Sequence, residues 1–164
     1  MGSRVGQGFD AHRFAADPSR PLRLALLEWP GELGLEGHSD GDVAIHALVD
    51  ALGAAAGLGD IGQLFGTHRP QFTGARSAVF LTEMVRQVRR AGFEVENATI
   101  QVLGNHPRIT TRRAEAEHGI GQILDAPVTL TATTTDAMGF TGRGEGLAAL
   151  AVCLLRQAPP GGTR

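Results

Sequence analysis

The stretch SDGDVAIHALVDAL, residues 39–52, places three acidic side chains and one histidine on an otherwise apolar run. Apolar residues recur along it at helical spacing, which predicts a buried helix. Ser39 is a favourable N-cap, and Asp42 three positions later completes an S-x-x-D capping pattern. Gly57 and Gly59 are expected to end the helix. An acidic side chain and a histidine one turn apart are unusual on such a helix and need a chemical reason.

A second polar pair lies in RVGQGFDAH, residues 4–12, whose alternating pattern predicts a strand. Residues i and i+2 of a strand share a face, so Asp10 and His12 could bind one ion together. With His46 from the helix they would offer one carboxylate and two imidazoles, which is typical of a catalytic zinc site with an open position. Asp42 or Asp50 could then hold an imidazole in the required tautomer.

Spacing alone leaves another interpretation of this group open. Asp42 is already explained as a capping residue, and a histidine on an apolar helix is commonly a core residue with satisfied polar atoms. The glycines of GQG, residues 6–8, leave one face of the strand without side chains. Such glycines mark places where the backbone approaches a ligand or another backbone closely.

The remaining patterns interleave strands with helices. Helices are predicted at 75–91 and 110–124, strands at 98–104 and 127–135, and a short hairpin near 22–32, whereas residues 146–155 fit a strand or a buried helix equally well. These elements predict an α/β fold, an α+β sandwich with a single sheet packed against helices. We expect residues 1–156 to form one domain and residues 157–164 a disordered tail.

The composition excludes several classes of function. With 15 basic and 17 acidic residues the net charge is −2, which gives no reason to expect nucleic acid or a membrane as partner. The lone Cys153 excludes an intrachain disulfide and fits a reducing compartment. The sequence contains no stretch of about 20 apolar residues and no signal-peptide pattern, so a cytoplasmic protein is expected.

A hydroxyl-rich strand end runs into a glycine loop in TATTTDAMGFTGRGEG, residues 131–146. Threonine hydroxyls, loop amides and an arginine are common means of holding phosphate oxygens. The alternative is a β-strand that uses threonine for its branched side chain and ends in a hairpin turn. GNHPRI, residues 104–109, is a second candidate phosphate contact through Arg108.

Four motifs in order, GFDAH (8–12), GHSDGDVAIHALVDAL (37–52), GLGDIG (57–62) and ATTTDAMGFTGRGEG (132–146), resemble the 2-C-methyl-D-erythritol 2,4-cyclodiphosphate synthase family. The resemblance runs from about Arg4 to Arg156. It implies a homotrimer with sheets facing the trimer axis and active sites between subunits. It also implies cyclisation of 4-diphosphocytidyl-2-C-methyl-D-erythritol 2-phosphate with release of CMP, in the non-mevalonate isoprenoid pathway. In that reaction the 2-phosphate of the substrate attacks the β-phosphorus.

The resemblance assigns roles to particular residues. It implies that Asp10, His12 and His46 bind Zn²⁺ or another divalent ion, and that a second ion, Mg²⁺ or Mn²⁺, bridges the substrate phosphates. His38 and Thr134 match the positions that stabilise the transition state. The substrate-binding positions that it implies are Asp10, His12, His38, Ser39, Asp60, Ile61, Gly62, Arg108, Thr133, Thr134, Thr135, Asp136, Phe140 and Arg143.

The chain departs from the family pattern at three places. Asp136 stands where the family usually has Glu, and Arg108 stands where it usually has Lys, which keeps the charge and changes the geometry. Residues 66–69 read GTHR instead of a segment with two carboxylates. Two alternative functions follow: a related metal-dependent phosphoesterase that uses water as nucleophile, and a non-catalytic trimer that binds an isoprenoid diphosphate.

Overall fold

The computed structural model describes residues 2–37, 39–60, 62 and 75–159. In this part of the chain the main sheet has four strands in the order β1–β6–β4–β5. The strands are β1 (Ser3–Arg13), β4 (Phe93–Leu103), β5 (Val128–Thr133) and β6 (Gly146–Gln157). Strand β6 is antiparallel to both β1 and β4, and β5 is parallel to β4. The predicted sheet packed against helices is confirmed.

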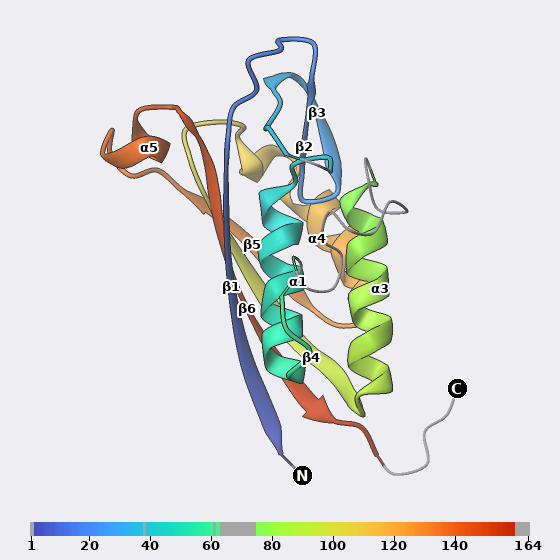
Figure 1. Ribbon diagram of the computed structural model, residues 1–164. Helices are drawn as coiled ribbons and strands as arrows, with labels where there is room; N and C mark the ends of the chain where they lie inside the picture. Colours follow the sequence, from blue (N-terminus) through green and yellow to red (C-terminus); the bar gives the residue numbers. More distant parts are fainter. Residues whose placement is uncertain (1, 38, 61, 63–74, 160–164) are drawn as a thin grey trace.

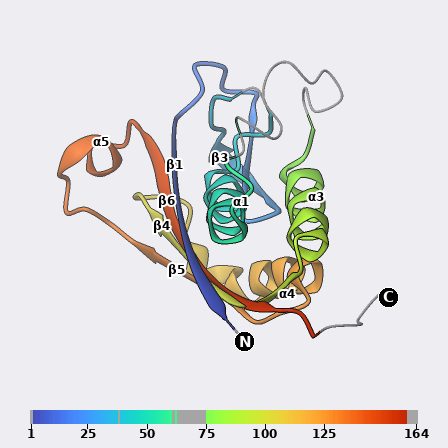
Figure 2. The ribbon, with the colours of Figure 1, turned by 60° about the horizontal axis from the view of Figure 1, so that its bottom comes forward.

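Three helices cover one face of this sheet. They are α1 (Val43–Ala56), α3 (Ser77–Arg90) and α4 (Arg113–Leu124). Both ribbon views place them on the same side of the sheet (Figures 1 and 2). None of the helices in the described part of the chain has the length and apolar character that crossing a bilayer would require.

The smaller elements lie at one end of the molecule. The predicted hairpin is confirmed as strands β2 (Pro21–Leu24) and β3 (Leu27–Leu33), which form a separate two-stranded sheet. A 3₁₀ turn, η2, spans Ile109–Thr111, and a one-turn helix, α5, spans Gly139–Gly142. The hairpin and α5 both lie near the end of the sheet where β1 ends (Figure 1).

The start of α1 differs from the prediction. The helix begins at Val43, and its N-cap is Asp42, whose carboxylate accepts a hydrogen bond from the Ile45 N–H at 3.2 Å. The prediction of Ser39 as N-cap was wrong. Both residues suit the position by type, and the structure uses the one nearer the apolar run. Gly57 ends the helix as predicted, in the left-handed conformation.

Residues 146–155 form a strand, which resolves the ambiguity of their pattern. Strand β6 lies between β1 and β4 and is buried along most of its length, so it reads as a nearly continuous apolar run instead of an alternating one. The strand continues through Gln157, and the Ala158 N–H donates to the carbonyl of Gly92 at 2.9 Å. The rest of the predicted tail, 160–164, lies outside the described residues.

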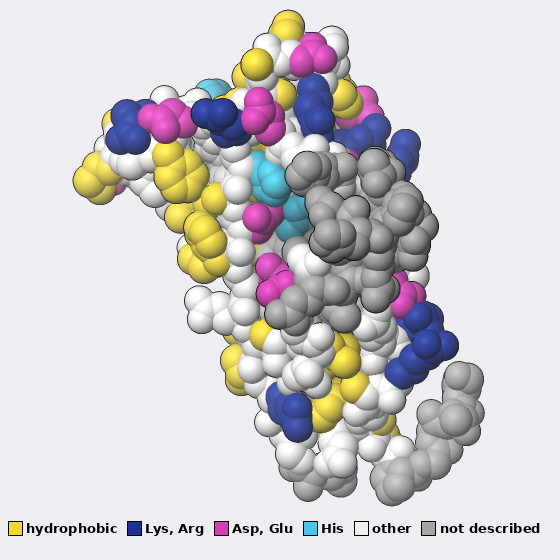
Figure 3. Space-filling model, viewed as in Figure 1, with side chains coloured by type: hydrophobic (Ala, Val, Ile, Leu, Met, Phe, Trp, Pro, Cys, Tyr) yellow, Lys and Arg dark blue, Asp and Glu magenta, His cyan; other side chains and the backbone are white. Residues whose placement is uncertain are grey.

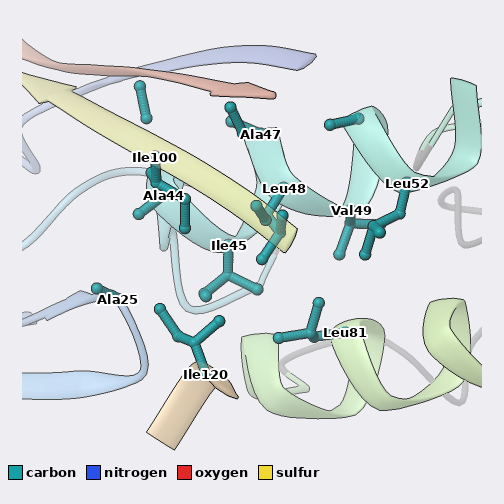
Figure 4. Close-up of a cluster of buried hydrophobic side chains, with 14 of the residues drawn as sticks. Ala25, Ala44, Ile45, Ala47, Leu48, Val49, Leu52, Leu81, Ile100 and Ile120 are labelled. Carbon is teal, nitrogen blue, oxygen red and sulfur yellow. The ribbon is translucent and has the colours of Figure 1, made fainter. Parts of the chain in front are cut away.

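Helix α1 lies directly on the backbone of β1. A Cβ atom added at Gly6 would lie 1.9 Å from the carbonyl oxygen of Ala51, and one at Gly8 would lie 2.0 Å from that of Ala47. The predicted close backbone approach at these glycines is therefore confirmed. On its other side α1 packs against the remaining helices, where Ile45 faces Leu81 of α3 and Ile120 of α4 (Figure 4).

Replacing Gly8 by Ala is expected to lower the free energy of unfolding by about 1–3 kcal/mol, since the new methyl group meets backbone atoms of α1 that cannot turn away. Urea denaturation would measure the loss. Gly2→Ala is the matched control, because a Cβ at Gly2 has no heavy atom within 4 Å. Equal urea midpoints for the two variants would contradict the close packing of α1 on β1.

Cys153 lies in β6 on the face that α1 covers, and its burial raises the pKa of the thiol from 9.0 to about 11. The neutral thiol therefore dominates at pH 8, and it is the thiolate that reacts. We expect a thiol reagent at pH 8 to label the urea-unfolded chain fully and the folded chain hardly at all. Equal labelling rates for the folded and unfolded chains would contradict the burial of Cys153.

The same shift predicts a pH dependence of stability. Because the pKa of the Cys153 thiol is higher in the folded than in the unfolded state, the free energy of unfolding should decline as the pH rises from about 9 to about 11.

Candidate metal centre and active site

Strand β1 and helix α1 bring three candidate ligands together. Asp10 and His12 come from the end of β1, His46 comes from the first turns of α1, and one donor atom of each lies within 4.8 Å of the others. The close packing of α1 on Gly8 puts His46 over the end of the strand. The predicted convergence is confirmed. Histidine and acidic side chains appear together on the surface in this region (Figure 3).

One carboxylate oxygen faces both imidazoles. Asp10 Oδ2 lies 2.9 Å from His12 Nε2 and 3.1 Å from His46 Nδ1. The His46 side chain is buried, whereas Asp10 and His12 are partly exposed. Donor atoms that converge from two elements and keep an exposed side are arranged as a catalytic metal site requires.

The outer nitrogens of the two imidazoles are held from the opposite side. His12 Nδ1 is hydrogen-bonded to the backbone carbonyl of Glu36, and His46 Nε2 lies 3.1 Å from Ser39 Oγ. These contacts leave Nε2 of His12 and Nδ1 of His46 directed at Asp10. The Glu36 carbonyl can only accept, so it places a proton on His12 Nδ1, and the Ser39 hydroxyl helps to orient the His46 ring. Asp42 and Asp50 were the two candidates for this role. The carboxylate of Asp42 bonds instead to Ala25, Leu26, Ile45 and Ser77, and the outer nitrogens are held by Glu36 and Ser39.

The electrostatics of the group suit a cation. Burial opposes ionisation of Asp10, but hydrogen bonds and charge from His12 and His46 outweigh it and hold the pKa of Asp10 well below its usual range. The hydrogen bond to Asp10 is the main cause that raises the pKa of His12 above its usual value. Asp10 is therefore ionised at neutral pH.

Asp42 has a structural role that the sequence did not reveal. Its fully buried carboxylate accepts hydrogen bonds from the N–H groups of Ala25 and Leu26, both at 2.9 Å, and from the hydroxyl of Ser77 at 3.0 Å. Together with its cap on α1, it joins the β2–β3 turn to the starts of α1 and α3. The sequence contained one sign of this role, the capping pattern before an apolar run. That pattern predicted a cap bond such as the one to Ile45, but not the bonds to Ala25, Leu26 and Ser77.

Asp40 also serves the fold. Its carboxylate accepts a hydrogen bond from the Ser77 N–H at 2.7 Å, at the first residue of α3. An acid at this place also suits the positive end of the helix dipole. Two of the acids in the opening motif thus position helices, and one of those helices carries His46.

The threonine-rich segment follows β5 and is organised by its own hydrogen bonds. The hydroxyl of Thr135 donates to the Met138 carbonyl at 2.7 Å and lies 2.9 Å from that of Thr141. The Asn105 side chain donates to the Gly142 carbonyl at 3.0 Å. The loop contains the helical turn α5, so the alternative of a plain hairpin turn is excluded.

The other predicted phosphate and substrate positions lie on the surface. Thr133 is exposed at the end of β5, and Thr134 and Asp136 are exposed in the loop that follows, where Asp136 adopts the left-handed conformation with φ of 49°. The further exposed positions are Arg108 before η2, Phe140 in α5, Arg143 after it, and Asp60 and Gly62 after α1. Predicted positions His38, Ile61 and the segment 66–69 lie outside the described residues.

Within the described part of one chain, the threonines at the end of β5 lie apart from the metal group, although the far end of their loop returns to it, where Phe140 and Glu145 line one pocket with His12. Strand pairing aligns Ala11 with Ala148, Leu103 and Thr133 in turn, so β1 and β5 are three strand spacings apart, about 14 Å. Asp10 and His12 point toward the helices, whereas Thr133 belongs to the opposite set of alternating side chains. A single chain therefore brings Phe140, but not Thr133, close to the metal group.

The fold and the Asp-His-His group define an α/β protein with a candidate divalent-metal centre at one end of its sheet. Residues 3–156 match the model of the YgbB family, and the chain belongs to this family. It is 54% identical over 152 residues to the 2-C-methyl-D-erythritol 2,4-cyclodiphosphate synthase of Acidothermus cellulolyticus, covering 93% of each chain.

Solved structures give the same relationship. A 2C-methyl-D-erythritol-2,4-cyclodiphosphate synthase structure in a CDP-bound form superposes with a TM-score of 0.85 at 36% identity, over 93% of this chain and all of that one. The bifunctional IspDF protein of Campylobacter jejuni superposes with a TM-score of 0.89 at 38% identity. The match covers 95% of this chain and 42% of that larger protein.

Proposed function

We propose that this chain is a cyclodiphosphate synthase of isoprenoid biosynthesis, which converts 4-diphosphocytidyl-2-C-methyl-D-erythritol 2-phosphate into the 2,4-cyclic diphosphate and CMP. The observation that carries the proposal is the convergence of Asp10, His12 and His46 within 4.8 Å in a chain of this family. The CDP-bound relative supports a cytidine nucleotide as part of the substrate.

The Asp-His-His group would hold the first metal ion. Its donors are one carboxylate oxygen and two imidazole nitrogens, and the outer nitrogens of both rings are already engaged by Glu36 and Ser39. This donor set suits Zn²⁺. When bound, such an ion supplies Lewis-acid polarisation of phosphate oxygens. The protein residues keep Asp10 ionised and hold each ring with one nitrogen directed at the centre.

The exposed loop after β5 would hold the diphosphate and its nucleotide. Thr133, the last residue of β5, and Thr134 carry exposed hydroxyls that can donate to phosphate oxygens, and the Thr135 hydroxyl would do so by giving up its bond to the Met138 carbonyl. Arg143 and Arg108 can neutralise the charge of the phosphates. Asp136 is the candidate protein ligand of a second divalent ion, Mg²⁺ or Mn²⁺, shared with the phosphates.

Because the 2-phosphate of the substrate is the nucleophile, the protein needs only to orient the reacting groups and stabilise charge. We assign the stabilising role to Thr134 and His38. The other proposed contacts, to the substrate's polar groups, are Ser39, Asp60, Ile61, Gly62 and Phe140.

The separation of the β5 threonines from the Asp-His-His group supports an assembly with active sites between copies. A neighbouring chain would bring its threonine loop to the Asp-His-His group of the first. The face of the sheet opposite the helices carries exposed apolar side chains, with Val5, Phe9 and Val152 exposed by 71%, 56% and 42%. Such a patch favours association. We propose a homotrimer with these faces turned toward its axis.

Incubation with the diphosphocytidyl 2-phosphate substrate, Zn²⁺ and Mg²⁺, followed by ³¹P NMR, tests the function. The proposal expects resonances of the cyclic diphosphate and of CMP. A linear phosphorylated product with CMP would assign a phosphoesterase instead. Absence of turnover with one metal ion still bound per chain would assign a non-catalytic binding protein.

A further inference from the structure

Arg20 lies in the connection between β1 and β2, and its guanidinium reaches the segment next to the metal group. Its Nη2 donates to the backbone carbonyl of Ser39 at 2.8 Å and to that of Gly37 at 3.2 Å. Both acceptors belong to the segment that precedes the cap of α1. One side chain therefore holds the carbonyls of Gly37 and Ser39, both of which lie outside helices and strands.

The described residues of the stretch before α1, Glu36, Gly37 and Ser39, contact the two imidazoles from the side away from Asp10. The Glu36 carbonyl accepts from His12, and a Cβ added at Gly37 would lie 3.1 Å from the His12 ring. Ser39 places its hydroxyl 3.1 Å from His46 Nε2. The orientation of each ring consequently depends on where this segment lies.

The two ends of the stretch are anchored differently. The Glu36 N–H donates to the backbone carbonyl of Arg13 at 2.9 Å, so Glu36 is fixed by main-chain pairing to β1. Among the hydrogen bonds of the described residues, the one that fixes the main chain of Ser39 comes from the Arg20 side chain. Arg20 should therefore matter more for His46 than for His12.

The main chain of Arg20 is itself held by two hydrogen bonds. Its carbonyl accepts from the Gly34 N–H at 3.1 Å, and its N–H donates to the Asp17 carbonyl at 3.2 Å. The two backbones are in close contact, since a Cβ at Gly34 would lie 2.5 Å from the Arg20 carbonyl oxygen. Arg20 thus connects Gly34, which follows the β2–β3 hairpin, to Gly37 and Ser39 next to the metal group.

We propose that Arg20 is a positioning residue of the metal centre, which orients His46 by fixing the main chain of Ser39. The proposal rests on the Asp-His-His group being the metal site of the proposed function. It assigns to Arg20 no contact with substrate or metal. Losing the two Arg20 hydrogen bonds would let the Ser39 hydroxyl move away from His46 Nε2, so the ring would be held less firmly and would bind the metal more weakly.

The direction in which metal affinity changes when Arg20 is removed distinguishes a positioning role from a charge effect. Arg20 also brings a positive charge toward His12. If charge were its only influence, removing it would strengthen the binding of a cation. Positioning predicts the reverse, because outer contacts that orient a ligand histidine contribute 10- to 100-fold to metal affinity.

The test compares Arg20→Ala, Arg20→Lys and the control Arg23→Ala, which removes a neighbouring arginine that pairs with Glu28 at 2.8 Å. Zn²⁺ affinity is measured by competition with a chromophoric chelator, and Co²⁺ is bound in place of Zn²⁺ to record its visible absorption. We expect Arg20→Ala to weaken Zn²⁺ binding about 10-fold and to alter the Co²⁺ spectrum. Arg20→Lys should lie in between, and Arg23→Ala should match the wild type.

Unchanged or tighter binding in Arg20→Ala would overturn the proposal, as would an equal loss in Arg23→Ala. If Arg20→Ala does not fold, as judged by thermal unfolding of the metal-free protein, Arg20→Lys decides by the same two measurements. A wild-type chain that binds neither ion would overturn the metal centre and this proposal with it. Metal binding without cyclisation would count against the proposed function alone.

Discussion

His46→Ala is expected to abolish stoichiometric Zn²⁺ binding and to lower the rate of cyclisation by more than about 100-fold, because changes to outer contacts alone already cost 10- to 100-fold in affinity or activity. The variant removes one of three converging donors and leaves Asp10 with a single imidazole. Chelator competition measures the metal content, and ³¹P NMR of the substrate mixture measures turnover.

The matched control for this variant is His118→Ala. His118 is exposed on α4, outside the Asp-His-His group, so its loss should leave metal content and turnover at wild-type values. If His46→Ala retained one tightly bound Zn²⁺ per chain, the assignment of the site would be wrong. Retained metal with lost turnover would instead show that His46 acts on the substrate and not as a ligand.

Of the substitutions considered, Asp42→Ala should lower the free energy of unfolding most, by about 3–5 kcal/mol. The change leaves the N–H groups of the buried Ala25 and the half-buried Leu26 without an acceptor, together with the buried hydroxyl of Ser77. It also removes the cap of α1. Urea denaturation followed by circular dichroism measures the loss.

Two further variants sharpen this measurement. Asp42→Asn keeps one acceptor oxygen and should lose less than Asp42→Ala. Asp17→Ala is the exposed control. Among the described residues its carboxylate accepts hydrogen bonds from the N–H and the hydroxyl of the nearby Ser19, and its loss should change stability by no more than about 0.5–1 kcal/mol. Similar urea midpoints for Asp17→Ala and Asp42→Ala would contradict the role of Asp42 as a buried connector.

The sequence predicted those features that depend on periodicity. Asp10 and His12 share a strand face because side chains alternate, and His46 faces them because a helix packs on the glycine face of that strand. These are local rules with a regular spacing, so the metal group could be proposed before its geometry was known.

Contacts made by backbone groups across long separations could not be predicted in this way. Every residue has a backbone carbonyl, so nothing in the sequence indicates that the one of Glu36 orients His12. Ser39 and Asp42 are both good caps, so the local pattern could not tell which would cap α1 and which would hold an imidazole. The central strand β6 lost its alternation because both of its neighbours are strands and much of it is buried.

The turn between β2 and β3 has an unusual dependence on the rest of the chain. Ala25 and Leu26 both adopt left-handed conformations, with φ of 54° and 68°, although neither is glycine or asparagine. Such conformations cost about 1–2 kcal/mol each for ordinary residues. The N–H groups of both residues bond to Asp42, which lies 17 and 16 positions further along the chain.

The hairpin is therefore not an autonomous folding unit, since its bend is imposed by a carboxylate that arrives with α1. Amide hydrogen exchange would expose this coupling. We expect the amides of Ala25 and Leu26 to open only together with those of α1, at the same free energy, although turns between short strands ordinarily exchange quickly. Faster exchange at the turn than in α1 would mean that the bend forms independently of the helix.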